Sequence, residues 1–294
     1  MSAAEIKLPL PAKELVPHRD SMLLLQTLDG YTEESANARI LVKDELLFIK
    51  NSGQIDPVVY VEFLAQLVAA HSGYTAKLDG GSVKTGFLVG IKDFHIKSTV
   101  KAGDELHLSI KKDYSFDQIS YLTGEVKKGN DIIGSGTLKL WEHNEGGPVL
   151  PDNSGNEPTE PMVKREWQEL ADQMFLNEQI LKYIVSIKEY DQQFITEISF
   201  GNGFTGFKGH FPGMPILPGV IMLKTGLLLG EVITKHSLLP VNIKQAKFAK
   251  SILPNEKIKV SSTFQSNRDA IRLSTVIIKN QETCAKFSID CIKH

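Results

Sequence analysis

Residues 58–70 read VVYVEFLAQLVAA, a stretch that is apolar on nearly every face of a helix. A helix that is apolar all round has no side for solvent and is expected to be buried. Residues 220–229 have the same property. Strand-like runs stand before and after both stretches, mostly in antiparallel succession, and the run SMLLLQTL at 21–28 is among them. We therefore predict an α+β fold in which each half is a curved antiparallel sheet wrapped around one buried central helix.

The two halves of the chain follow the same order of elements. Four strand-like runs follow each helix, and the turn VKAGDEL at 100–106 aligns with ILPNEKI at 252–258. The distance along the chain between these matching segments is far too long for the repeat of a solenoid, so the repetition indicates two similar domains. The segment between them is rich in Pro, Gly, Asn and Glu, which is typical of a linker. We predict domains at 1–142 and 165–294, joined by a linker at 143–164.

Composition excludes several classes of protein. The chain has 33 basic and 35 acidic side chains, which argues against nucleic acid or an anionic membrane as the main partner. The sequence contains no run of about 20 apolar residues, so no membrane span is expected. The first residues are charged where a signal peptide needs an apolar run. The two cysteines show no metal-ligand spacing. We expect a cytoplasmic protein without a metal site.

Two polar residues interrupt the first apolar helix. Glu62 and Gln66 are four residues apart and so share one helix face. One interpretation is a carboxylate at the helix edge that is hydrogen-bonded or reaches solvent. The other is a carboxyl group in a desolvated pocket, where burial raises its pKa and keeps it protonated as an acid. Gln66 would then orient it.

The second helix follows a stiff, histidine-bearing loop. Residues 208–226 read KGHFPGMPILPGVIMLKTG, with three prolines within seven residues. A lone histidine is often structural, but this frame favours a functional role for His210. The backbone amides of Gly219 and Val220 at the helix start could hold a carbonyl oxygen that gains negative charge. Lys224, inside the helix, is not an acid.

These residues resemble a known family. GHFPGMPILPGVIML is similar to the signature of the FabZ-type 3-hydroxyacyl-acyl-carrier-protein dehydratases, which have the hotdog fold, and the resemblance covers most of residues 165–294. The first half resembles the same superfamily more weakly, through LVPHRDSMLLLQTL and VEFLAQLVA. It looks most like the small dehydratase-like proteins of aryl-polyene and related pigment pathways.

The resemblance implies the reversible loss of water from a 3-hydroxyacyl thioester on acyl carrier protein, which gives a trans-2-enoyl thioester without cofactor or metal. It implies that His210 is the base and that Gly219, with Val220, donates to the thioester oxygen. Phe211 and Gln66 are expected in the substrate site. The pathway expected is fatty-acid or aryl-polyene (flexirubin-type) pigment biosynthesis.

The chain departs from the family in complementary ways. The family's acid lies fourteen residues after its histidine, and that position is Lys224 here. Fourteen residues before Glu62 stands Phe48, so one half has the base and the other has the acid. Because hotdog sites of this type lie between two domains, we predict an intramolecular pseudo-dimer with one composite site. Glu62 and His210 would form it, and Phe48 and Lys224 would mark a dead counterpart.

Two alternatives from other functional classes stay open at this point. A hotdog acyl thioesterase would hydrolyse the thioester, and a non-catalytic module would only bind an acyl carrier protein or its acyl chain. His18 and Arg19, in the PHR triplet, are compatible with carrier docking or with a structural role. Further homo-oligomerisation is possible on sequence grounds.

Overall fold

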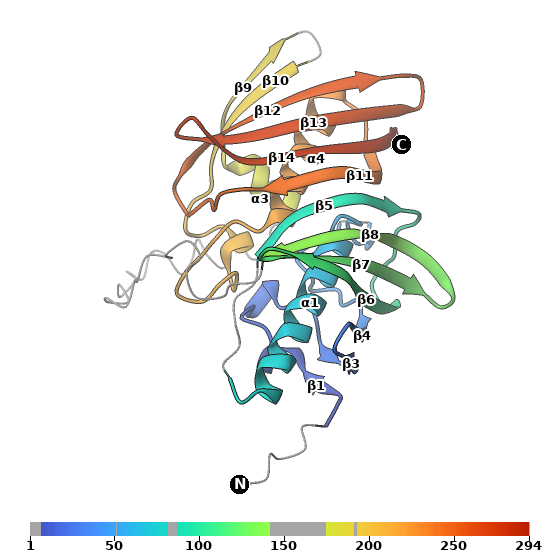
Figure 1. Cartoon of the computed structure of the whole chain (residues 1–294). Coiled ribbons are helices and arrows are strands. Elements are labelled where there is room, and N and C mark those ends of the chain that lie inside the picture. The colour runs from blue at the N-terminus through green and yellow to red at the C-terminus, as the bar shows by residue number, and fades with distance from the viewer. Residues whose placement is uncertain (1–6, 51, 82–86, 142–174, 191–192, 294) are drawn as a thin grey trace.

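The two halves of the chain share one continuous antiparallel sheet. The computed structural model describes residues 7–50, 52–81, 87–141, 175–190 and 193–293, and the predicted linker lies outside them. The sheet has twelve strands in the order β3-β4-β6-β7-β8-β5-β11-β14-β13-β12-β10-β9. Figure 1 shows the first half below, in blue and green, and the second half above, in yellow to red. The two central helices, which begin at Val59 and Gly219, lie against the same face of this sheet.

The first half contains β1 and β2, a small separate ladder, and then six strands of the large sheet. Its elements are β1 (Leu10–Pro11), β2 (Thr27–Leu28), β3 (Gly30–Thr32), β4 (Ser35–Leu41), α1 (Val59–Leu78), β5 (Phe87–Ile96), β6 (Glu105–Phe116), β7 (Ile119–Lys128) and β8 (Asp131–Trp141). The elements of the second half are α3 (Leu176–Lys182), β9 (Ile184–Tyr190), β10 (Gln193–Ser199), α4 (Gly219–Thr234), β11 (Leu238–Phe248), β12 (Lys257–Ser266), β13 (Ala270–Lys279) and β14 (Glu282–Lys293).

From each outer edge of the sheet to its centre, the two halves present their equivalent strands in the same order. Strands β3, β4, β6, β7, β8 and β5 correspond in order to β9, β10, β12, β13, β14 and β11. The innermost strands, β5 and β11, pair antiparallel across the seam, with Phe94 opposite Ile243. Antiparallel pairing of equivalent strands relates the halves by a pseudo-twofold axis. The predicted double hotdog fold is confirmed.

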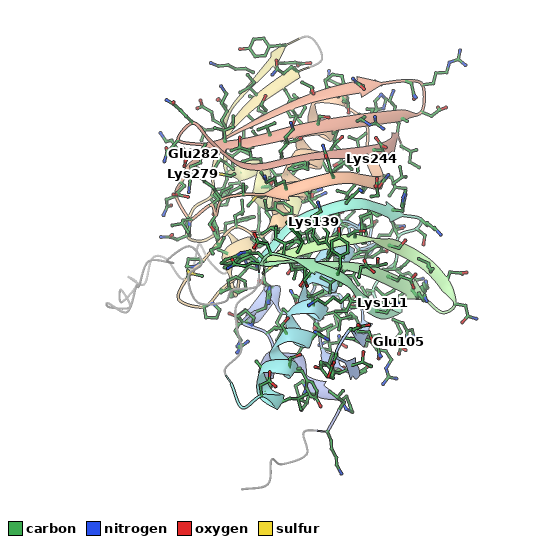
Figure 2. All side chains as sticks on the ribbon, in the orientation of Figure 1. Glu105, Lys111, Lys139, Lys244, Lys279 and Glu282 are labelled. Carbon is green, nitrogen blue, oxygen red and sulfur yellow. The ribbon has the colours of Figure 1, made fainter. Side chains whose placement is uncertain are left out.

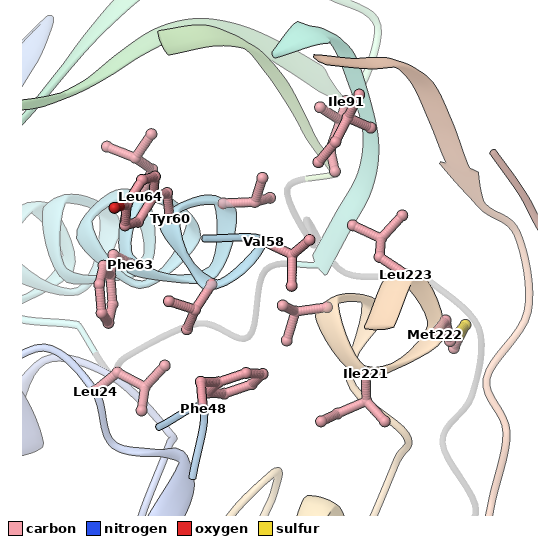
Figure 3. Close-up of a cluster of buried hydrophobic side chains, with 14 of the residues drawn as sticks. Leu24, Phe48, Val58, Tyr60, Phe63, Leu64, Ile91, Ile221, Met222 and Leu223 are labelled. Carbon is pink, nitrogen blue, oxygen red and sulfur yellow. The ribbon is translucent and has the colours of Figure 1, made fainter. Parts of the chain in front are cut away.

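The two central helices are buried as their composition predicts. Twelve residues of α1 and eleven of α4 are buried, and the starts of the helices contact each other. Figure 3 shows Val58 at the start of α1 near Leu223 of α4, with Phe48 below both helices. Each fully buried large apolar side chain contributes about 1.5–3 kcal/mol of hydrophobic stabilisation. The outer face of the sheet carries charged side chains such as Lys111, Lys139 and Lys244 (Figure 2).

One expected strand is mostly absent. Residues 21–28, SMLLLQTL, have a strand-like composition, but only Thr27–Leu28 pair in a ladder. The amides of Leu24 and Leu25 donate instead to the side chain of Gln66. Their backbone hydrogen bonds are therefore used to hold a polar side chain of α1. No local sequence pattern indicated α3 or β9.

Among the described residues, no helix is long and apolar enough to cross a membrane.

Candidate active site

Backbone hydrogen bonds fix which residues of the two halves correspond. Ile55 N donates to Val100 O, and Leu217 N donates to Ile252 O, each at 2.8 Å. Ile55 and Leu217 therefore occupy equivalent places, just before α1 and α4 respectively. Counting seven residues on pairs Glu62 with Lys224, and counting seven back pairs Phe48 with His210.

The seam between the halves brings the predicted acid and base together. Glu62 comes from α1, and His210 comes from the loop before α4. One nitrogen of His210, one nitrogen of His18 and one carboxylate oxygen of Glu62 all lie within 4.8 Å of one another. Residues about 150 positions apart in the sequence thus form one cluster, and the cluster includes a second histidine.

Gln66 holds Glu62 in a fixed orientation. The Gln66 amide Nε2 donates to Glu62 Oε1 at 2.9 Å and to Met22 O at 2.8 Å. Its Oε1 accepts from the amides of Leu24 and Leu25. Because the backbone amides can only donate and the Met22 carbonyl can only accept, the two ends of the Gln66 amide cannot be exchanged. The expected orienting role of Gln66 matches this geometry.

The charge state of Glu62 differs from the expectation. Glu62 is only 4% exposed, and this burial favours the neutral acid. Contacts with His18, His210 and Gln66 outweigh the burial, so the pKa of Glu62 lies below its usual value. Of the two interpretations of Glu62, the one with a raised pKa is therefore wrong, because it counted desolvation and omitted two histidines brought in by the fold. Glu62 is a carboxylate at neutral pH in this state.

His210 is arranged to act as a base. Its Nδ1 lies 2.9 Å from the carbonyl oxygen of Ile216. A carbonyl only accepts hydrogen bonds, so Nδ1 carries the proton and Nε2 keeps its lone pair. Burial and the nearby charge of His18 lower the pKa of His210 from 6.5 to about 4, against the opposing effect of Glu62. The imidazole is neutral at pH 7 and can take up a proton.

The loop that carries His210 is clamped onto the first half. Arg19 N donates to Gly209 O at 2.9 Å, and Ser21 Oγ donates to Lys208 O at 3.2 Å. Gly209 has φ +86°, and a Cβ at this position would lie 1.7 Å from Arg19 O. Only glycine allows this approach of the two backbones. The PHR segment is thus part of the interface that sets the distance between His210 and Glu62.

Phe211 and the start of α4 complete the surroundings. Phe211 is buried, and its ring contacts the rings of His210 and His18 at centroid distances of 4.2 and 4.9 Å. At the helix start, Ile221 and Met222 donate to Pro218 O. The amides of Gly219 and Val220 have no backbone acceptor among the described residues. These two N–H groups remain able to bind a substrate oxygen.

The pseudo-symmetric position holds an ion pair in place of an acid and a base. Lys224 Nζ lies 2.6 Å from Asp56 Oδ2, and Lys50 Nζ lies 3.8 Å from the same oxygen. A cavity of about 350 Å³ is lined by Phe48, Asp56, Lys224 and the start of α3. Among the described residues, no histidine lines this cavity. Phe48 and Lys224 thus line one cavity, and the inactivity of this counterpart stays a prediction.

His18 is the residue of this cluster that sequence reasoning placed elsewhere. Its Nε2 lies 3.5 Å from Glu62 Oε1, an ion-pair distance. An imidazole nitrogen and a carboxylate oxygen at this distance can form a charge pair or exchange a proton. The available signal was the PHR triplet itself, which precedes the apolar run that wraps Gln66.

Comparisons with known proteins agree with the division into two halves. Residues 10–149 match the family model ApeP-like: ApeP dehydratase, and residues 186–288 match ApeI-like: ApeI dehydratase. The chain is 28% identical over 109 residues to the 3-hydroxyacyl-[acyl-carrier-protein] dehydratase FabZ of Blochmanniella floridana, covering 34% of this chain and 71% of the relative. It is also 28% identical over 97 residues to FabZ of Klebsiella pneumoniae, covering 30% of this chain and 64% of that protein.

Solved structures show the same fold. The dehydratase domain of PpsC from Mycobacterium tuberculosis is similar with a TM-score of 0.56 at 12% identity, covering 94% of this chain and 100% of that domain. An acyl-ACP thioesterase from Bacteroides thetaiotaomicron gives 0.53 at 9% identity, covering 90% and 100%. Both enzyme classes share the fold, so the fold does not choose between them. The family models do: the chain is a fused double-hotdog dehydratase, ApeP-like in its first half and ApeI-like in its second.

Proposed function

We propose that the chain dehydrates 3-hydroxyacyl thioesters at one composite active site, with His210 as the base and Glu62 as the acid. The observation that carries this proposal is the approach of His210 and Glu62, from opposite halves, to within 4.8 Å. Neither half holds both groups. The domain that ends near residue 142 contributes the acid, and the domain after the linker contributes the base.

The spacing of these groups suits loss of water across adjacent carbons. His210 Nε2 removes the proton from C2 of the acyl chain, and Glu62 protonates the hydroxyl that leaves C3. Each group must come within about 3 Å of its target. C2 and the C3 oxygen are separated by only two bonds, so a base and an acid a few ångströms apart can reach both.

The start of α4 is suited to the thioester carbonyl. Removal of the C2 proton places negative charge on the thioester oxygen. The amides of Gly219 and Val220 can donate to that oxygen at the positive end of the helix dipole. Ile216 lies between His210 and Gly219 in the chain. Its carbonyl accepts from Nδ1 of His210 and its N–H donates to the His210 carbonyl, so it fixes the base close to the start of α4.

We further propose that the thioester is carried by the phosphopantetheine arm of an acyl carrier protein, in fatty-acid or aryl-polyene biosynthesis. The names of the FabZ relatives support the carrier. The exposed Lys208 adjoins the His210 loop and could receive an acidic carrier. The two described cysteines are free thiols, which fits a cytoplasmic location.

The test compares variants of the full chain with a 3-hydroxyacyl acyl carrier protein as substrate. Glu62→Gln and His210→Asn should each lower kcat by about 10²–10⁴-fold, the usual contribution of a general acid or base. Mass spectrometry of the carrier should show loss of water with the thioester intact. Glu178→Gln at the dead counterpart and His107→Asn on the exposed face of β6 are matched controls and should keep wild-type rates. Free acid in place of enoyl product would indicate a thioesterase, and an unchanged substrate would indicate a binding module.

A further inference from the structure

The proposed mechanism leaves the source of one proton open. Glu62 must be protonated to act on the 3-hydroxyl group, yet its surroundings keep it ionised in the resting state. Gln66 donates a hydrogen bond to Glu62 but has no proton to give up at neutral pH. His210 must be neutral to take the C2 proton. The acid therefore needs a proton from another group.

His18 is placed to hold that proton. Its ring is 7% exposed, and its Nε2 lies 3.5 Å from Glu62 Oε1. On its other side, its ring centroid lies 5.2 Å from that of His210. Its Nδ1 is buried and has no hydrogen-bond partner among the described residues. His18 thus lies beside both the acid and the base, and its Nδ1 is without a partner among the described residues.

The other charged group near His18 is already engaged. The guanidinium of Arg19 donates to the carbonyls of Val16 and His18, so it is directed at the backbone. Within the part of the chain that the structure describes, the titratable groups that contact the His18 ring are Glu62 from α1 and His210 from the loop before α4. A proton lost by one of these three groups can be taken up by another.

We propose that His18 is a positioning residue that supplies Glu62 with the proton given to the leaving hydroxyl group and later recovers a proton from His210. This inference rests on the proposed function. In the proposed cycle, the proton starts on His18 Nε2, which faces the Glu62 carboxylate. Transfer within the pair gives neutral His18 and the neutral acid.

The proton cycle balances over one turnover. The C2–H bond breaks, its proton goes to His210 Nε2, and its electron pair forms the C2=C3 double bond. The C3–O bond breaks as Glu62 delivers its proton, and water leaves. His210 is then an imidazolium, Glu62 a carboxylate and His18 neutral. Transfer of the proton from His210 to His18 restores the resting state without exchange with solvent.

Substrate binding provides the physical reason for the first transfer. A separated pair of charges is stabilised by water and by nearby dipoles. When the acyl chain fills the site and excludes water, desolvation favours the neutral form of both partners. The proton therefore moves from His18 to Glu62 when the substrate is in place.

The kinetic test is His18→Gln in the full chain, with His107→Gln on β6 as the matched control. The variant should lower kcat by about 10²-fold or more, as for loss of a proton donor, with KM changed less than about threefold. The high-pH limb of the kcat profile should move to lower pH by about one unit or more, because Glu62 alone must then retain the proton. His18→Gln added to Glu62→Gln should cost little more, since His18 acts through Glu62.

Three kinetic results would overturn the inference. They are a kcat within twofold of wild type, a lower kcat with an unmoved high-pH limb, or loss of activity on treatment with EDTA. The last result would indicate a metal at the cluster.

A measurement on the intact wild-type protein does not depend on the folding of any variant. Nitrogen-15 NMR of labelled histidines should show His18 as an imidazolium at pH 7, and Glu62→Gln should convert it to the neutral ring. A neutral His18 in the wild type overturns the inference while leaving the proposed function intact. If the wild type produces no enoyl thioester at all, the proposed function itself fails.

Discussion

Lys224 Nζ lies 2.6 Å from Asp56 Oδ2, and both side chains are only 4% exposed. Lys224 occupies the place that Glu62 has in the other half, so a buried cation stands where the second acid would be. The ion-pair partner comes from the opposite half, just as His210 meets Glu62 across the seam. Burial alone would raise the pKa of Asp56, but Lys224 and Lys50 lower it overall. The pair therefore links the two halves by a buried charge contact.

Removal of one partner of this pair should destabilise the protein strongly. Lys224→Met leaves the Asp56 carboxylate buried without its nearest cation, and the expected loss is about 3–5 kcal/mol. Replacing both residues, as Lys224→Met with Asp56→Leu, should restore or exceed wild-type stability. Urea denaturation measures the free energy of unfolding. Lys50→Met, which removes the more distant and more exposed cation, is the control and should cost under about 1 kcal/mol.

The double variant should also keep dehydratase activity. Because the proposed function assigns the chemistry to His210 and Glu62, kcat is expected to stay within a few-fold of wild type. A loss comparable to that of Glu62→Gln in a stable Lys224→Met/Asp56→Leu protein would show that both sites are needed.

Gly209→Ala should separate the two halves of the active site. The added Cβ would meet Arg19 O at 1.7 Å, so either the backbone or the PHR segment must move. We expect a loss of about 2–5 kcal/mol from the clash and the left-handed backbone together. The rate should fall further than stability alone explains, because His210 moves away from Glu62. Unfolding curves and kcat under folded conditions measure the two effects.

Gly213→Ala is the matched control for this prediction. Gly213 lies in the same loop at φ +74°, but a Cβ added there would have no heavy atom within 4 Å. It should show only the backbone strain, about 1–2 kcal/mol. Equal losses for both variants would mean that contact with Arg19 is not what Gly209 provides.

Gln66→Leu should weaken both stability and catalysis. The change leaves the buried amides of Leu24 and Leu25 without their acceptor, at a cost of roughly 2–4 kcal/mol. It also removes one donor to Glu62, so the pKa of Glu62 should rise and its position should become less fixed. Thr225→Val removes only a hydrogen bond within α4 and should be nearly neutral. Thermal unfolding and kcat distinguish these outcomes, and a fully stable Gln66→Leu protein would contradict the assignment.

The low-pH limb of kcat/KM should lie near pH 4. Burial and His18 lower the pKa of His210 to about 4, and the base acts only when it is neutral. Activity should therefore persist well below pH 6.5, the usual pKa of histidine, and fall as His210 becomes protonated. Circular dichroism at each pH checks that the fold persists. A limb near pH 6.5 in folded protein would show that His210 is more solvated than this structure indicates.

Protein stability should fall over an adjoining range of pH. The folded-state pKa of Asp56 lies below its usual value, so its contribution is fully present above about pH 3.9, the unfolded value. That contribution decreases as pH falls toward the folded pKa. The kinetic limb of His210 should therefore be measurable before this ion pair is lost.

Much of the fold followed from local patterns. The apolar character of residues 58–70 and 220–229 required buried helices, and the alternating runs after them required strands. The helix ends were less certain, since α1 continues to Leu78 beyond its all-apolar part. The prediction of a strand over residues 21–28 was wrong for a related reason. Their composition suits a strand, but the backbone amides of Leu24 and Leu25 bond to a distant side chain that local sequence does not show.

The sequence alone determined that the chain has two similar domains, that Glu62 and His210 stand at non-equivalent positions of different halves, and that each half lacks the group which the other retains. Only the tertiary structure decided the rest. It brought His18 to Glu62, reversed the expected direction of the Glu62 pKa shift, and gave Lys224 a buried partner in Asp56. The physical reason is distance: pKa values and ion pairs depend on groups a few ångströms apart, and here those groups are 44 to 192 residues apart in the sequence.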